Sequence, residues 1–135
     1  MSGPVFADTA YYVALTNPRD QYAAAAANWT VSFDGVMVTT AWILTEVANF
    51  LAATPANRSL FLALYQDLQT DNRVNIVSPS PQLFEKGVKL FADRPDKQWS
   101  LTDCISFIVM QDQYLTDALT GDRHFEQAGF VALLK

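Results

Sequence analysis

Short apolar runs, often rich in β-branched residues, alternate with longer helical patterns along this chain. The apolar runs cover residues 5–7, 36–40, 74–77, 118–120 and 131–134, and the helical patterns cover residues 18–33, 42–53, 57–68, 81–92 and 101–114. Strands that alternate with helices are typical of βαβ units, in which a parallel sheet is covered by helices on both faces. The pattern therefore predicts an α/β fold, a three-layer α/β/α sandwich with a central parallel sheet.

The size and composition of the chain fit one such domain. Its 135 residues, half of them hydrophobic, suffice for one well-packed core and are too few for two. No internal repeat or linker interrupts the sequence, so we expect a single domain over residues 1–135. The aromatic residues at positions 84, 91, 107 and 125 stand at positions typical of core packing.

Net charge, cysteine content and hydropathy exclude several classes of partner, site and location. The net charge of −5 argues against a broad basic face for nucleic acid, although it is compatible with a local basic rim. The single cysteine, Cys104, cannot form an internal disulfide or a multi-cysteine zinc site, and we expect a buried, inert thiol. The longest nearly uncharged stretch, residues 36–45, is too short to span a bilayer, and the N-terminus lacks a signal-peptide pattern. We expect a soluble cytoplasmic protein.

Four acidic residues from distant segments are expected at one edge of the sheet. Asp8 ends the first strand and Asp122 follows the fourth, so both belong at the carboxyl edge of a parallel sheet, where α/β proteins carry their functional residues. Asp103 lies in the first turn of the last long helix, and Glu46 lies near the start of the helix after the second strand. Four carboxylates in one place need a counter-ion, and oxygen ligands favour Mg²⁺ or Mn²⁺.

Each acid also has a purely structural interpretation. Asp8 can end a strand or cap the turn that follows, and Glu46 can lie on a helix edge. Asp103 fits a capping box with Ser100, and Asp122 can cap the short helix that follows it. The convergence of all four, rather than any single acid, favours the metal site. His124, the only histidine, is interpreted as a residue at the start of that short helix rather than a catalytic group.

Four stretches carry a family resemblance that runs in order along the chain: residues 6–9, 45–47, 100–107 and 118–130. In them the chain resembles PIN-domain nucleases, close to the VapC-type toxins of bacterial toxin–antitoxin pairs. The last two stretches are specific, whereas the first two would be weak alone. The resemblance implies a PIN-like fold with four metal-binding, catalytic acids: Asp8, Glu46, Asp103 and Asp122. It also implies that Thr9 and Thr102 are polar helpers beside the first and third acids.

The same resemblance implies an activity and partners. The expected activity is Mg²⁺- or Mn²⁺-dependent endoribonuclease cleavage of RNA that leaves 5′-phosphate and 3′-hydroxyl ends. The expected partners are a second copy of the chain and an antitoxin protein whose tail covers the acidic cleft. Gly121 stands where the family often has a bulkier residue, which is expected to loosen the loop that holds Asp122. Candidates for a rim that attracts RNA phosphates are Arg123, Lys86, Lys89, Arg94 and Lys97.

Two alternatives stay open. A phosphatase or receiver-like α/β domain also has an aspartate after its first strand, but it requires a second acid close by and a lysine at the sheet edge. Here Asp8 is followed by Thr-Ala-Tyr-Tyr, and no lysine precedes Lys86. A catalytically silent PIN-fold protein-binding module would be expected to have lost part of the acid set, which is intact.

Overall fold

The strands form an all-parallel sheet with the first strand at its centre. The computed structural model describes residues 3–135, and its five strands have the order β3-β2-β1-β4-β5. Their bounds are Val5–Ala7 (β1), Met37–Thr40 (β2), Val74–Val77 (β3), Asp117–Leu119 (β4) and Val131–Ala132 (β5). Phe6 lies opposite Val38 of β2 and Ala118 of β4. The strand order reverses between β1 and β4, and this pairing brings the ends of the two strands, followed by Asp8 and Asp122, side by side.

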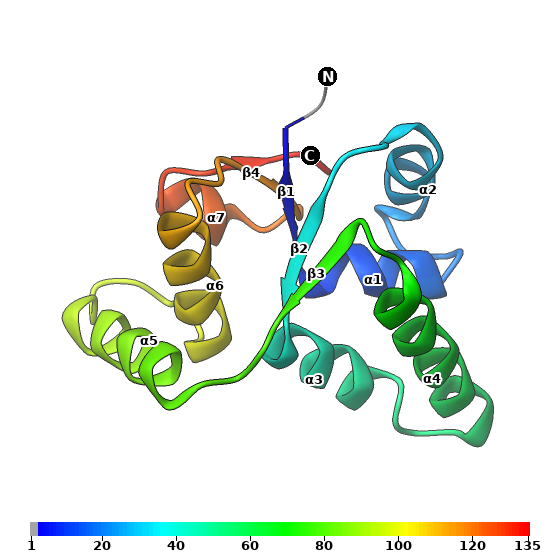
Figure 1. Cartoon of the computed structure of the whole chain (residues 1–135), viewed down its shortest axis with the longest axis horizontal. Helices are drawn as coiled ribbons and strands as arrows, with labels where there is room; N and C mark the ends of the chain where they lie inside the picture. Colours follow the sequence, from blue (N-terminus) through cyan, green and yellow to red (C-terminus); the bar gives the residue numbers. More distant parts are fainter. Residues whose placement is uncertain (1–2) are drawn as a thin grey trace.

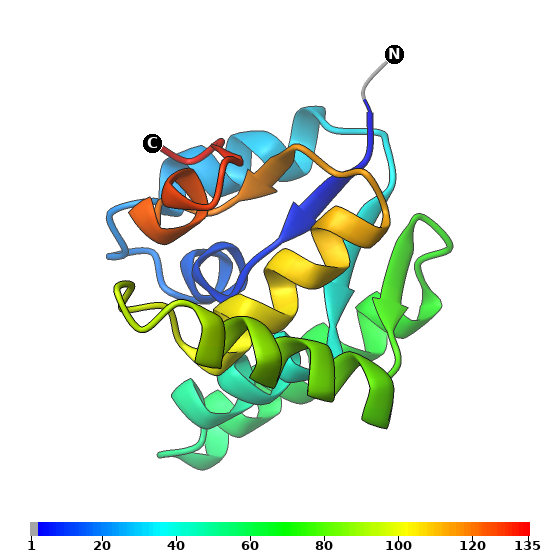
Figure 2. The same ribbon diagram turned by 90° about the vertical axis from the view of Figure 1, so that its left-hand side faces the viewer.

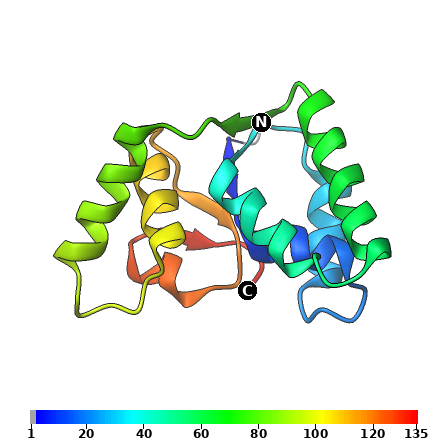
Figure 3. The same cartoon turned by 90° about the horizontal axis from the view of Figure 1, so that it is seen from below.

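Helices cover both faces of this sheet, which confirms the predicted three layers. Their bounds are Thr9–Thr16 (α1), Ala23–Ser32 (α2), Ala41–Phe50 (α3), Pro55–Thr70 (α4), Pro81–Asp93 (α5), Leu101–Asp112 (α6) and Arg123–Gln127 (α7). Helices α1 to α4 lie on one side of the sheet and α5 to α7 on the other (Figures 1 and 3). Within residues 3–135, no helix combines the length and the apolar character needed to cross a membrane.

Hydroxyl caps fix the points at which four of the helices begin. The side chains of Thr40, Thr54, Ser80 and Ser100 accept hydrogen bonds from backbone amides in the first turns of α3, α4, α5 and α6. Such a bond satisfies one of the otherwise unpaired donors of a helix start. Helices α4 and α5 also begin with a proline, whose missing amide proton costs nothing at that position. The caps place α3 and α6 with their N-termini toward the carboxyl edge of the sheet.

An aromatic cluster packs α6 and α7 against the sheet. The ring of Phe107 lies edge-on to Trp99 and Phe125, at centroid distances of 5.0 and 4.9 Å, and Phe6 of β1 lies 6.3 Å from Phe125. Edge-to-face arrangements of this kind match the quadrupoles of the rings. Phe107 and Phe125 are fully buried, which confirms that these two aromatic residues are core residues.

The other two aromatic positions, Phe84 and Phe91, are not in the core. Their exposed fractions are 42% and 52%, so the prediction that they pack inside is wrong. The reason is the way α5 meets α6: Gly87 is buried, and a Cβ added there would overlap the side chain of Ile105. Helix α5 therefore approaches α6 through its glycine, and part of its apolar stripe faces outward.

The largest difference from the sequence-based elements lies between β1 and β2. Helix α1 was not predicted, and the helix expected over residues 18–33 begins only at Ala23. Helix α1 has the sequence TAYYVALT, with aromatic and β-branched residues that are weak helix formers. It forms because it buries Tyr11, Tyr12 and Ala14 against the core. Elsewhere β1 and β3 agree with prediction, and the other elements differ at their ends by a few residues.

Candidate functional site

An open pocket of about 510 Å³ at the carboxyl edge of the sheet contains all four predicted acids. Asp8 follows β1, Glu46 lies on α3, Asp103 on α6 and Asp122 in the turn after β4. The pocket lining also includes residues that were not predicted there: Asp20, Tyr22, Gln98 and His124. The topology brings the acids together because β1 and β4 are neighbours and α3 and α6 both begin at this edge.

Asp8 is the most deeply buried of these acids. Its residue is 6% exposed, and its Oδ2 accepts a hydrogen bond of 2.8 Å from the hydroxyl of Thr120. Burial raises the pKa of Asp8 from 3.8 to about 7; bonds from the Thr120 hydroxyl and the Thr9 amide oppose the rise, and the charges of Asp103 and Glu46 add to it. Because burial penalises the ionised form of Asp8, a cation bound nearby would stabilise its carboxylate.

Asp103 both caps a helix and faces the pocket. Its amide donates to Ser100 Oγ at 3.0 Å, and its Oδ2 accepts from the Ser100 amide at 3.2 Å, so the capping box suggested by the sequence is present. Burial raises the pKa of Asp103, the Ser100 amide opposes this rise, and the nearby charge of Asp122 adds to it. The two roles coexist because the capping bond fixes the carboxylate at the helix start, where it lines the pocket.

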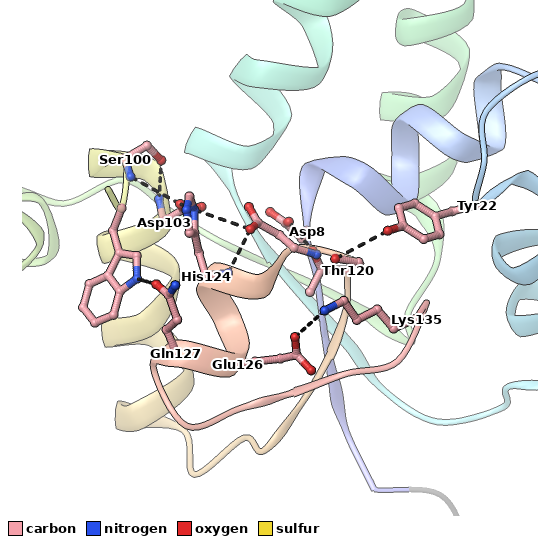
Figure 4. Close-up of polar contacts among 12 residues, drawn as sticks. Asp8, Tyr22, Ser100, Asp103, Thr120, His124, Glu126, Gln127 and Lys135 are labelled. Carbon is pink, nitrogen blue, oxygen red and sulfur yellow. Dashed lines mark hydrogen bonds and ion pairs between the residues drawn. The ribbon is translucent and has the colours of Figure 1, made fainter. Parts of the chain in front are cut away.

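His124 contacts two of the acids, Asp103 and Asp122, and Figure 4 shows it beside Asp103. Its Nδ1 is 3.2 Å from Asp103 Oδ2 and 3.4 Å from Asp122 Oδ1, and its amide donates to Asp122 Oδ1 at 2.9 Å. One ligand atom from each of these three residues lies within 4.8 Å of the others. His124 is indeed near the start of α7, and Asp122 caps that helix, as the sequence suggested. Its place among the carboxylates was missed, because no sequence pattern paired it with Asp103.

Glu46 is joined to the helix that follows β1. The hydroxyl of Thr9, the first residue of α1, donates to Glu46 Oε1 at 2.6 Å. This contact links the start of α1 to α3 across the floor of the pocket. Thr102 is not among the residues that line the pocket within the described chain.

The turn that carries Asp122 is packed rather than loose. A Cβ added to Gly121 would overlap the ring of Tyr22, whose hydroxyl donates to the Gly121 carbonyl at 3.5 Å. On the other side of the turn, Thr120 Oγ1 accepts from the Asp122 amide at 3.0 Å. The expected loosening at Gly121 is therefore wrong, since the missing side chain makes room for Tyr22.

The remaining chemical candidates lie outside the pocket lining. Cys104 is buried, and burial raises the pKa of its thiol to about 11, which agrees with an inert thiol. Three of the proposed rim cations, Lys86, Lys89 and Arg94, are paired with Asp112, Asp93 and Asp96. Helix α5, which carries the two lysines, contributes no residue to the pocket.

Comparisons with known proteins match the chain over nearly its full length. A family model described as PIN domain matches residues 5–131. The 23S rRNA-specific endonuclease VapC20 of Mycobacterium tuberculosis is 28% identical over 127 residues, which cover 94% of this chain and 95% of the relative.

Solved structures share the fold. The crystal structure of Mycobacterium tuberculosis VapC20, described as a sarcin-ricin loop cleaving toxin, matches with a TM-score of 0.84 and 24% identity, over 94% of this chain and 96% of that one. FitAcB from Neisseria gonorrhoeae matches with a TM-score of 0.63 and 15% identity, over 95% of this chain and 94% of that one.

Proposed function

The chain belongs to the PIN-domain family, and we propose that it is a divalent-metal-dependent endoribonuclease that acts as the toxin of a toxin–antitoxin pair. The observation that carries this proposal is the meeting of Asp8, Glu46, Asp103 and Asp122, from four distant segments, in one pocket. The name of the relative VapC20, a 23S rRNA-specific endonuclease, supports RNA as the substrate class.

The donors in the pocket fit a hard divalent cation. Carboxylate oxygens are the ligands that Mg²⁺ and Mn²⁺ prefer, and those of Asp103 and Asp122 lie within 4.8 Å of each other and of His124 Nδ1. The raised pKa of Asp8, about 7, reflects burial that a bound cation would offset. When bound, such a cation lowers the pKa of a water molecule and neutralises charge that develops on the phosphate. We propose Mg²⁺ or Mn²⁺ held by the four acids.

Neighbouring polar groups hold these acids in place before substrate arrives. The contacts are Thr9 to Glu46, Thr120 to Asp8, the Ser100 amide to Asp103 and the His124 amide to Asp122. Each carboxylate therefore has a hydrogen-bond partner that fixes the position of one of its oxygens. Preorganised charges of this kind contribute to catalysis because they need little rearrangement in the transition state.

The wider parts of the proposal concern organisation and partners. We propose a single PIN domain over residues 1–135, a homodimer, an antitoxin protein that covers the acidic pocket, and a cytoplasmic location. The family match over residues 5–131 supports the single domain.

Cleavage of RNA by the purified chain tests the enzymatic core of the proposal. A panel of single-stranded, hairpin and ribosomal RNAs is incubated with Mg²⁺, with Mn²⁺ and with EDTA. We expect cleavage that requires the metal and disappears in Asp8→Asn and Asp103→Asn, and that is retained in Asp67→Asn, which changes an exposed acid on α4. Undiminished cleavage in EDTA, or in both site variants, would contradict the proposed mechanism.

A further inference from the structure

Most cations of this protein already have an anionic partner. Five of the nine lysines and arginines lie within 4.0 Å of a carboxylate, namely Arg73, Lys86, Lys89, Arg94 and Lys135. Within residues 3–135, Arg19, Arg58, Lys97 and Arg123 form no such pair. A cation next to a carboxylate presents little net charge to a third group, so these four are the side chains best able to attract another anion.

Three of these four unpaired cations are sequence neighbours of residues that line the acidic pocket. Arg19, Lys97 and Arg123 are each adjacent in sequence to a residue that lines the pocket, respectively Asp20, Gln98 and Asp122. We call Arg19, Lys97 and Arg123 the cationic rim. Arg58 is different, since it lies on α4, donates to the carbonyl of Ala52 at 3.0 Å and lines a separate cavity.

The rim residues come from three separate parts of the fold. Arg19 lies in the loop between α1 and α2, Lys97 in the loop between α5 and α6, and Arg123 at the first position of α7. In Figure 2 these loops and α7 lie on one side of the molecule, and Figure 3 shows the two loops on opposite sides of α7. Arg19 and Arg123 are exposed, and Lys97 is half-buried.

The charges of the pocket and of the cationic rim are opposite in sign. The protein has a net charge of −5, and five acids line the pocket: Asp8, Asp20, Glu46, Asp103 and Asp122. A polyanion that approaches the pocket is repelled except where positive charge is exposed beside it. The cationic rim supplies such charge from three separate segments next to residues that line the pocket, so an extended polyanion that crosses the pocket can contact more than one of them.

We propose that the cationic rim binds phosphates of RNA on both sides of the phosphate that enters the acidic pocket. This inference rests on the proposed function and names the residues that position the substrate. Single-stranded or looped RNA fits best, because a flexible strand can bend to reach cations on two loops and at the start of α7. An acidic protein segment offers a similar charge and is distinguished by the experiment.

Salt-dependent RNA binding tests the role of the rim. A fluorescein-labelled RNA hairpin is titrated with Asp8→Asn protein in Mg²⁺, so that binding is measured without cleavage, at several KCl concentrations. Arg19→Gln, Lys97→Gln and Arg123→Gln are each added to that background. Loss of one phosphate contact on a single strand is expected to lower the magnitude of the slope of log affinity against log salt by about 0.7. Over a tenfold decrease in salt, from 1 M to 0.1 M, the affinity of the variant relative to its parent then falls roughly fivefold.

Lys86→Gln and Lys89→Gln are matched controls, because these lysines are paired and lie on α5, outside the pocket. We expect them to leave the slope unchanged. In cleavage-competent protein, the three rim variants are expected to raise KM while kcat is retained, which a merely structural role would not produce.

The outcomes separate this proposal from the proposed nuclease activity. If the salt slope of RNA affinity is unchanged in the rim variants, or falls equally in the control variants, the proposal that the cationic rim binds RNA phosphates is wrong, even if RNA is cleaved. If RNA binding depends on the cationic rim but the wild-type protein cleaves no RNA, the proposed nuclease activity is wrong and the proposed role of the rim in binding is supported. Polyglutamate of equal charge and unlabelled hairpin are compared as competitors of the labelled hairpin. If polyglutamate competes equally well, the rim binds an acidic protein segment, and RNA as its ligand is refuted.

Discussion

Asp8→Asn is expected to make the metal-free protein more stable at alkaline pH while removing cleavage. Asp8 is 6% exposed, and the pKa of its carboxyl is raised from 3.8 to about 7, mainly by burial. The substitution keeps the size of the side chain and an oxygen that can accept the hydrogen bond of Thr120, but it removes the charge.

The sign and size of this effect follow from the raised pKa of Asp8. Below pH 3.8 the carboxyl is protonated in both the folded and the unfolded chain, so it carries no penalty there. As pH rises, the unfolded chain ionises first, and the wild-type protein loses stability until the folded-state pKa of about 7 is passed. The interval between the two pKa values corresponds to a penalty of up to about 4 kcal/mol in the free energy of unfolding above pH 7.

Thermal and urea unfolding in EDTA at pH 4 and pH 8 measure the difference. At pH 8 the melting temperature of Asp8→Asn should exceed that of wild type by on the order of 10 °C, and at pH 4 the two should nearly coincide. Asp67→Asn, which changes an exposed acid, should match wild type at both pH values. Mn²⁺ should stabilise wild type more than the Asp8 variant. Equal stability at pH 8, or a gain of the same size at pH 4, would refute the reasoning.

Three further predictions concern the walls of the pocket and its surroundings. Gly121→Ala should cost about 1–3 kcal/mol in unfolding free energy, because its Cβ would overlap Tyr22; adding Tyr22→Ala should recover part of that loss, and no recovery would argue against the overlap. Ser100→Ala should lower the free energy of unfolding by about 1 kcal/mol, because the helix cap is lost, and should retain measurable cleavage. Asp103→Asn should abolish cleavage with a similar or smaller change in stability. Unfolding and cleavage assays on the same samples distinguish the two effects. The buried thiol of Cys104, whose pKa is raised to about 11, should resist a thiol reagent at pH 8 until urea unfolds the protein; rapid labelling of the folded protein would contradict this.

The sequence predicted the positions of the strands better than it predicted the helices between β1 and β2. Strand β1 is a short apolar run whose three residues are all buried, and in β3 the three apolar residues are half-buried while Asn75 is exposed. Helix α1 was missed because its residues favour other conformations locally, and burial of Tyr11 and Tyr12 decides the outcome. Likewise, the outward position of Phe84 depends on the contact of Gly87 with Ile105, which no local pattern reveals.

The acids of the site could be anticipated because topology alone determines where strand ends and helix starts meet. The supporting residues could not. Tyr22 reaches Gly121 across 99 residues of sequence, and His124 contacts Asp103 because α7 folds back beside the start of α6. Such contacts depend on loop conformation and side-chain packing, for which the sequence offers no spacing rule. Asp20 was missed for the same reason, since it lies in a loop that was predicted to be helix.

The pairing of β1 with β4 has a consequence for the timing of synthesis. Asp8 and Glu46 are synthesised long before Asp122 and Asp103 shortly before it, and β1 lacks one of its two neighbours until residues 117–119 are available. At about 5–20 residues per second, the 114 residues from Asp8 to Asp122 take roughly 6–23 s to synthesise. A nascent or prematurely terminated chain therefore has an incomplete pocket. Because the fourth acid follows β4, any activity that needs all four acids must wait until β4 and the turn after it have been synthesised.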